Sequence, residues 1–145
     1  TLTRGAIAFI DEADASRVAE YCWHLTSTGY AGATNASNEP LYLHRLILGL
    51  GPGEQVDHID GNKLNNRRAN LRICTPSQNG ANRGKQKNGK LSQRKGVTFD
   101  KSRGKWLAQI QCQGVRISRR FETEAQAAAF YRAIGQVLFG KFFRS

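Results

Sequence analysis

The run Asp57-His58-Ile59-Asp60-Gly61-Asn62-Lys63-Leu64-Asn65-Asn66-Arg67-Arg68-Ala69 holds most of the information in this chain. An acid stands beside a histidine, and amide side chains follow that histidine at Asn70 and Asn79. A carboxylate and an amide oxygen suit a hard divalent cation, and a histidine can accept a proton from water near neutral pH. This combination is what metal-assisted cleavage of a phosphodiester requires.

The positive charge of the chain is concentrated in one segment. The 145 residues carry a formal net charge of +11, and residues 84–121 contain eleven basic side chains against Asp100 alone. Such a surface favours double-stranded DNA as the partner, because each cation placed on a phosphate releases condensed counterions. A solvated basic face is the simpler alternative for scattered charge.

Composition excludes several other classes of protein. Hydrophobic residues make up 39% of the chain, which is enough for a packed core. No stretch approaches the ~20 apolar residues of a membrane span, so no membrane partner is expected. No signal-peptide pattern opens the chain, and Cys22, Cys74 and Cys112 lack metal-ligand spacing. We expect a protein that is not secreted and that acts in the cytoplasm of a bacterial or phage-infected cell, or wherever its target DNA lies.

Turn residues and apolar periodicity predict an α+β fold with a first domain over residues 1–83. The elements expected there are a strand over 4–11, helical turns over 14–21, a hairpin around 27–29, an apolar element over 41–48, a strand over 56–59 and a helix over 76–83. Residues 84–93 have little to bury and predict a flexible basic linker.

Residues 94–145 predict a second domain of a different kind. Alternating segments at 96–100, 106–112 and 115–121 indicate a three-stranded antiparallel sheet. A helix should follow, capped by Thr123, ended by Gly140, and packed on the sheet through its alanines.

The first domain resembles the HNH endonucleases of the homing type. The residues that carry the resemblance are His44-Arg45, Asp57-His58, Asn70-Leu71-Arg72 and Gln78-Asn79. The family builds its site as a β-hairpin and a helix around one divalent metal, the ββα-metal motif. The resemblance implies His58 as general base, Asn70 as the brace of its loop, and Asp57 and Asn79 as metal ligands. Oxygen ligands favour magnesium or manganese.

Other polar residues of the first domain have simpler explanations. Asp60, Asn62, Asn65 and Asn66 are expected to be turn residues, with Asp60 as a lesser alternative ligand. His44 is expected to be packed and hydrogen-bonded, with a secondary role near the scissile phosphate as the alternative, and His24 to be structural. The arginines beside the site are either surface charges or phosphate contacts, namely Arg45, Arg67, Arg68 and Arg72.

The second domain resembles the plant ethylene-response-factor type of DNA-binding domain. The matching residues are Arg94-Lys95-Gly96-Val97, Gly104-Lys105-Trp106-Leu107-Ala108, Phe121-Glu122-Thr123, Ala127-Ala128 and Tyr131. In that family the sheet lies in the major groove. The resemblance implies DNA contacts from strand residues, and alternation prevents all of them from facing DNA together. They are Arg94, Lys95, Thr98, Lys101, Arg103, Lys105, Gln109, Gln111, Arg116, Ser118 and Arg119 or Arg120.

Together these features predict a site-selective, metal-dependent DNA endonuclease with no small-molecule cofactor. One site per chain predicts nicking by a monomer or a weak dimer. The alternatives are a non-catalytic DNA-binding regulator with a relic nuclease domain, and a nonspecific or structure-selective nuclease.

Overall fold

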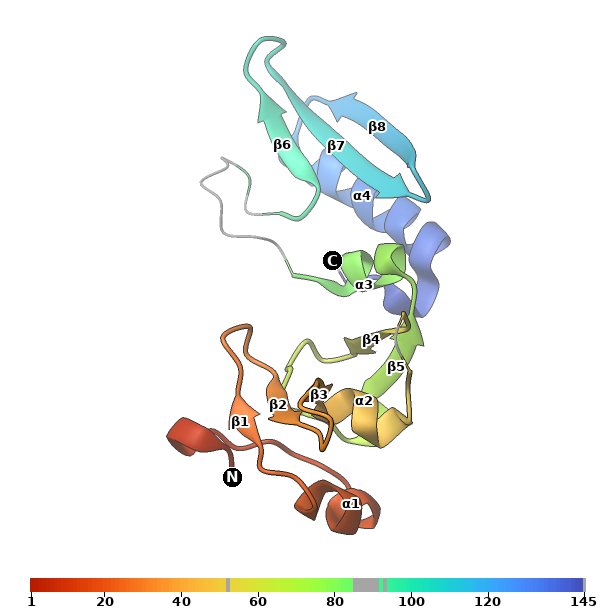
Figure 1. The fold of residues 1–145 in the computed structure, drawn as a ribbon. Helices are drawn as coiled ribbons and strands as arrows, with labels where there is room; N and C mark the ends of the chain where they lie inside the picture. The colour runs from red at the N-terminus through yellow and green to blue at the C-terminus, as the bar shows by residue number, and fades with distance from the viewer. Residues whose placement is uncertain (52, 85–91, 93, 145) are drawn as a thin grey trace. The chain divides into compact units, whose positions relative to one another are not determined.

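The computed structural model describes residues 1–51, 53–84, 92 and 94–144, and it divides into two compact units (Figure 1). The first unit is Thr1–Thr75 and the second is Pro76–Ser145. Both mix helices with antiparallel sheet, which confirms the predicted α+β class. Among the described residues, no helix is long and apolar enough to cross a membrane.

The first unit contains two small sheets and a few short helices. One sheet has the strand order β1-β2-β3, and the other is the ribbon β4-β5. The elements are η1 (Thr3–Gly5), η2 (Glu12–Asp14), α1 (Ala15–Ala19), β1 (His24–Leu25), β2 (Ala31–Thr34), β3 (Pro40–Tyr42), α2 (Leu43–Leu48), β4 (Gln55–His58), η3 (Arg68–Asn70) and β5 (Leu71–Cys74).

The strand expected over residues 4–11 was wrong, and the apolar element over 41–48 proved to be two elements. Residues 4–11 contain the end of η1 and a single bridge, Phe9 to Asn65, because this stretch pairs with a loop and not with a strand. The apolar run 41–48 divides into the end of β3 and the helix α2. Leu43 and Ile47 lie four residues apart and are both 1% exposed, so helical spacing buries them together. Gly49 ends α2 in the left-handed conformation, with φ 67°.

The second unit is a three-stranded sheet with a long helix along one face (Figure 1). Helix α4 begins with a capping box, in which Thr123 and Gln126 exchange side-chain-to-backbone hydrogen bonds of 3.3 Å. This arrangement confirms the predicted sheet and helix. The elements are α3 (Pro76–Asn82), β6 (Val97–Asp100), β7 (Lys105–Cys112), β8 (Val115–Phe121), α4 (Glu124–Phe139) and η4 (Gly140–Phe142).

Two glycines allow aromatic rings to pack in this unit. Gly96 has φ +68°, and a Cβ there would overlap the ring of Tyr131. A Cβ on Gly135 would overlap the ring of Phe143, which follows η4. The close approach of these rings therefore requires glycine at both positions.

Helix α3 lies in the second unit, whereas the sequence analysis placed it in the nuclease domain. Its Ala81 is 7% exposed and belongs to the hydrophobic core that contains Ala127 and Tyr131. Residues 85–91 and 93 of the predicted linker lie outside the described residues. Ser92 is fully buried, and its hydroxyl donates to Glu124 at 2.7 Å, so this end of the predicted linker is packed.

Candidate active site

The ribbon β4-β5 positions the acid and the histidine of the central motif. Asp57 pairs with Arg72 and His58 pairs with Leu71 in its antiparallel register. Successive side chains of a strand point to opposite faces, so Asp57 shares a face with Arg72 and His58 points to the other. Asp57 and His58 are both buried, at 5% exposure each.

Asn66 holds the imidazole of His58 in one orientation. Asn66 is fully buried, and its Oδ1 lies 3.2 Å from Nε2 of His58. An amide oxygen only accepts, so Nε2 donates and Nδ1 carries the lone pair. Burial lowers the pKa of His58, although Asn66 and the carboxylates of Asp60 and Asp57 oppose that effect. The arrangement favours a neutral imidazole that can accept a proton through Nδ1.

Aromatic rings cluster beside the imidazole of His58 on this face. The rings of Tyr30 and His44 lie 5.9 and 5.3 Å from that of His58, measured between centroids. Tyr42 stacks on His44 at 5.6 Å. Lys63 covers Tyr30 at 4.5 Å and donates to the carbonyl of Thr28 at 2.8 Å, which ties the loop after His58 to the β1–β2 turn.

His44 is packed as expected, but its hydrogen bonding differs from the expectation. The residue is 9% exposed, and within the described ranges its Nδ1 has no hydrogen-bond partner. Burial lowers the pKa of His44 to about 4, with smaller contributions from His58 and Arg45. The imidazole of His44 is therefore neutral, and it packs against the other rings of the cluster.

The loop 59–66 is held by its own polar side chains. Asn70 donates from Nδ2 to Asp60 Oδ1 at 2.9 Å and to the carbonyl of Asn65 at 2.7 Å, and its Oδ1 accepts from the Asp60 backbone at 3.0 Å. Asp60 also accepts from the backbone of Asn62 and from the side chain of Asn65. Asn70 thus makes the contacts that a loop brace needs.

The hydrogen bonds of Asp60 favour a role in stabilising the turn. Burial raises its pKa, but hydrogen bonds from Asn65, Asn62 and Asn70 outweigh burial and hold the pKa of this carboxyl below its ordinary value. Both carboxylate oxygens already accept hydrogen bonds within the loop. These bonds favour the turn role over the alternative of a metal ligand.

Asp57 and Asn79 are the two residues that the sequence predicts as oxygen ligands of a cation. Asp57 is on β4 in the first unit, and Asn79 is on α3 in the second. Their carboxylate and amide oxygens fit a hard cation such as magnesium or manganese. Among the residues that the structure describes, no group of three or more His, Cys, Asp and Glu side chains could hold a metal ion.

The four arginines expected near the phosphate have intramolecular contacts. Arg72 is bonded to Asp57, and Arg68 binds both carboxylate oxygens of the buried Asp14 at 2.9 and 2.6 Å. Arg45 donates to the carbonyls of Glu54 and Gly51, closing the loop after α2. Arg67 lies over the ring of Phe9 at 5.2 Å. Each has a structural contact, and Arg67 and Arg68 remain exposed.

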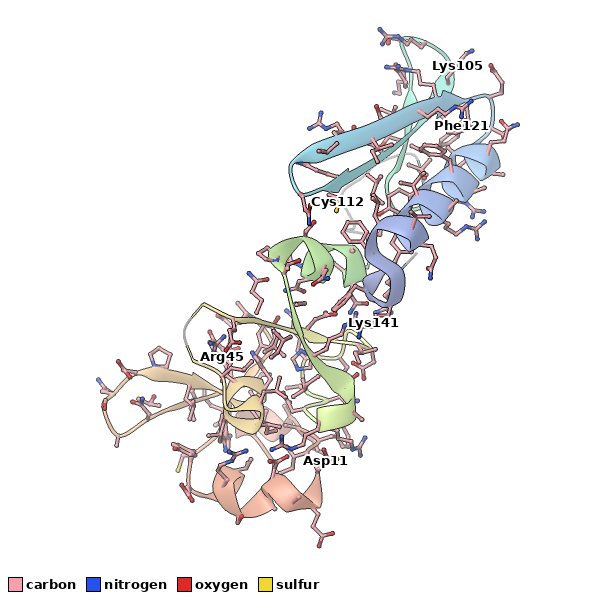
Figure 2. The ribbon with its side chains drawn as sticks, turned by 90° about the vertical axis from the view of Figure 1, so that its right-hand side faces the viewer. Asp11, Arg45, Lys105, Cys112, Phe121 and Lys141 are labelled. Atoms are coloured by element: carbon pink, nitrogen blue, oxygen red, sulfur yellow. The ribbon has the colours of Figure 1, made fainter. Side chains whose placement is uncertain are left out.

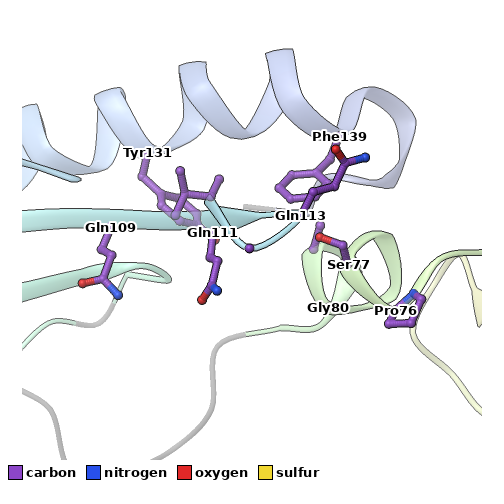
Figure 3. Close-up of a pocket in the computed structure, with 11 residues that line it drawn as sticks. Pro76, Ser77, Gly80, Gln109, Gln111, Gln113, Tyr131 and Phe139 are labelled. Atoms are coloured by element: carbon purple, nitrogen blue, oxygen red, sulfur yellow. The ribbon is translucent and has the colours of Figure 1, made fainter. Parts of the chain in front are cut away.

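The face of the second sheet away from α4 is polar. In the register of β7 and β8, Gln109 pairs with Ser118, Gln111 with Arg116, and Leu107 with Arg120. Paired residues share a face, and Figure 3 shows the side chains of Gln109 and Gln111 extending away from α4. We call this surface the outer face; its members are Thr98, Asp100, Lys105, Leu107, Gln109, Gln111, Arg116, Ser118 and Arg120, and Asp100 accepts a hydrogen bond from Arg120 at 3.1 Å.

Two expected DNA contacts lie elsewhere. Arg119 pairs with the core residue Ala108 and therefore faces the α4 side, so the register selects Arg120 for the outer face. Lys95 donates to the carbonyls of Ala81 and Arg144, and burial lowers its pKa to about 8. These contacts hold the ammonium group of Lys95 against the backbone of the second unit.

Figure 2 shows Lys105 and Phe121 near one end of the sheet and Cys112 at the other. Near the Cys112 end an open cavity of about 450 Å³ lies between β7 and α3 (Figure 3). Ser77, Gln109, Gln111 and Tyr131 are among its lining residues. The cavity therefore adjoins the two glutamines of the outer face.

Sequence reasoning missed the residues that enclose His58. Tyr30 and Tyr42 were assigned to a hairpin and an apolar run, and Asn66 to a turn. The sequence holds no signal that separates Asn66 from its neighbour Asn65, and only the structure shows that Asn66 is fully buried. A fully buried amide is exceptional unless it is hydrogen-bonded, and here it is bonded to the base.

Comparisons with known proteins agree with this geometry. The family described as HNH endonuclease matches residues 41–81, which include α2, β4, the loop, β5 and most of α3. An uncharacterised HNH endonuclease of Acanthamoeba polyphaga mimivirus is 34% identical over 144 residues, covering 96% of this chain and 74% of the relative. Protein 3.8 of Escherichia phage T7 is 32% identical over 92 residues, covering 63% of this chain and 75% of the relative. No solved structure matches. The relative from mimivirus matches nearly the whole chain, and the family model matches the segment that contains the Asp57-His58 motif: this chain belongs to the HNH endonuclease family.

Proposed function

We propose that this protein is a site-selective DNA endonuclease of the homing type that nicks one strand as a monomer. The observation that carries the proposal is the setting of His58, a buried imidazole oriented by Asn66 beside Asp57. Its loop is braced by Asn70. A nuclease site needs a base held in one geometry, and this chain provides one.

Each residue has a distinct task in the proposed reaction. His58 accepts the proton of the attacking water through Nδ1, and Asn66 keeps the ring in that tautomer. Asp57 and Asn79 hold one divalent cation, magnesium or manganese, which supplies charge stabilisation at the phosphate when bound. Asn70 fixes the loop that follows the base, so that the water and the imidazole stay within hydrogen-bonding reach.

We propose that the second unit holds the DNA through its outer face, in the manner of an ethylene-response-factor domain. The exposed Gln109, Gln111 and Arg116 offer the amide and guanidinium groups that read adenine and guanine in a major groove. The peripheral cations Arg94, Lys101, Arg103 and Lys105 are exposed and fit phosphate contacts. Site selection in this proposal therefore depends on the second unit.

Incubation with supercoiled plasmid tests the nuclease activity. With Mg²⁺ or Mn²⁺ we expect conversion to nicked circles before linear DNA accumulates, and none of it in EDTA. Asp57→Asn should reduce the rate by at least 10-fold, because it removes the charge that holds the cation. Plasmid that stays supercoiled across metals and DNA substrates would show that the proposed function is wrong.

The outer face predicts a specific salt dependence of DNA binding. Lys105→Gln should weaken binding and reduce the slope of log K against log salt by about 1, because this exposed lysine is a proposed phosphate contact. Arg132→Gln, at an exposed position on α4, is the matched control and should leave the slope unchanged. Fluorescence anisotropy over a series of salt concentrations measures both. Equal slopes for the two variants would remove Lys105 from the proposed phosphate contacts.

A further inference from the structure

Arg72 and Asp57 form the most enclosed ion pair of the first unit among the described residues. Nε and Nη2 of Arg72 both donate to Oδ2 of Asp57, at 2.9 and 2.6 Å. The side chain of Arg72 is 12% exposed and that of Asp57 is 6% exposed. Their pairing follows from the register, which sets the two residues opposite each other on one face of the ribbon.

In this position Arg72 and the proposed cation compete for the carboxylate of Asp57. Asp57 is the proposed carboxylate ligand of the divalent cation, yet its negative charge already has a guanidinium counter-ion. Leaving a buried carboxylate without a counter-ion is strongly unfavourable, so the metal-free protein needs Arg72. A bound cation takes over that role and is repelled by the arginine that remains nearby.

We propose that Arg72 is the counter-ion of Asp57 in the metal-free protein and that it sets the affinity of the site for a divalent cation. This inference rests on the proposed function, because it takes Asp57 as a metal ligand. Arg72 keeps the site assembled before metal binds, and it weakens metal binding through charge repulsion. It is a positioning residue, and its effect should be visible in metal binding as well as in cleavage.

Stability measurements on the full chain separate these effects. Without metal, Arg72→Gln should lower Tm by roughly 10 °C or more, because Asp57 loses its counter-ion. With MnCl₂ the same variant should recover more stability than the wild type does. We expect Arg72→Gln to have a Kd for Mn²⁺ lower than that of the wild type by on the order of tenfold. The metal-induced rise in Tm should then be about 5 °C larger in the variant than in the wild type. Titration calorimetry with MnCl₂ measures the Kd directly.

The pair between Arg68 and Asp14 provides a matched control. Asp14 is also buried, at 3% exposure, and Arg68 also binds it through two nitrogens, but neither residue belongs to the proposed site. Arg68→Gln should lower Tm and leave the Mn²⁺-induced rise equal to that of the wild type. Arg72→Lys keeps the charge but loses the two-donor contact. Its Mn²⁺-induced rise in Tm should therefore lie between that of the wild type and that of Arg72→Gln.

The outcomes distinguish this inference from the function on which it rests. If the wild type binds Mn²⁺ and Arg72→Gln binds it no more tightly, the inference is overturned and the proposed function stands. If Arg72→Gln does not fold with or without metal, a Kd for Arg72→Lys equal to that of the wild type overturns the inference. If Mn²⁺ and Mg²⁺ stabilise neither the wild type nor any variant, Asp57 is not a metal ligand, and the metal-dependent function fails as well.

Discussion

Replacing His58 with alanine is expected to lower the rate of plasmid nicking by ~10²- to 10⁴-fold, the range that a general base contributes. The imidazole is buried, its Nε2 is engaged by Asn66, and its Nδ1 lone pair is oriented for one task. Single-turnover nicking at saturating Mg²⁺ measures the chemical step without product release. DNA binding by the variant should remain within about twofold of the wild type, because the proposed DNA contacts lie on the second unit.

Two other histidines serve as comparisons for His58. His24 is exposed on β1, and His24→Ala should nick at the rate of the wild type. His44 packs against the base, and His44→Phe keeps an aromatic ring there. That variant should fold and lose much less activity than His58→Ala. If His58→Ala nicks as fast as His24→Ala does, the assignment of the general base is wrong.

The second unit could be predicted well because its signals are local. The strands β7 and β8 alternate along their length, and Gln113-Gly114 marks the turn between them, with φ 49° and 82°. Thr123 and Gln126 stand three residues apart, which is the spacing of a capping box. Each of these features depends on residues that are close in the sequence. The sequence pattern alone was therefore sufficient to predict the strands, the turn and the start of the helix.

The first unit was harder because its elements are short and depend on distant partners. Strand β5 has four residues and contains Arg72, and it forms because β4 lies opposite. The stretch around Phe9 is extended only where the loop at Asn65 and Asn66 bonds to it. Such elements have weak intrinsic preference, and tertiary contacts decide their conformation.

The candidate site shows the same division between local and distant signals. Asp57, His58 and Asn70 were proposed as site residues from identity and spacing, since the chemistry restricts the residue types. Tyr30 contacts His58 from another sheet, Tyr42 stacks on the neighbouring His44, and nothing in the spacing of the motif points to either tyrosine. The cross-strand pairing of Arg72 with Asp57 required a register that became known only with β5 in place.

The brace at Asn70 should be nearly as sensitive as the base itself. Asn70→Ala removes three hydrogen bonds and leaves the backbone N–H of Asp60 and the carbonyl of Asn65 without that partner. The base then sits at the start of a loosened loop, and a misplacement of about 1 Å can reduce the rate by roughly 10²-fold. Because the loop is largely exposed, the loss of stability should stay near ~1–3 kcal/mol.

Asn70→Asp separates the donor function of the amide from its acceptor function. The substitution preserves the oxygen that accepts from the Asp60 backbone, but it replaces the Nδ2 donor with a second carboxylate beside Asp60 Oδ1. Two carboxylates at hydrogen-bonding distance repel each other, so we expect Asn70→Asp to nick no faster than Asn70→Ala at neutral pH. Asn62→Ala, which removes one hydrogen bond to Leu64 within the same loop, is the milder control. If both variants at position 70 nick at the rate of Asn62→Ala, the loop does not need its brace, and the position of His58 must be set by Asn66 and the aromatic rings around it.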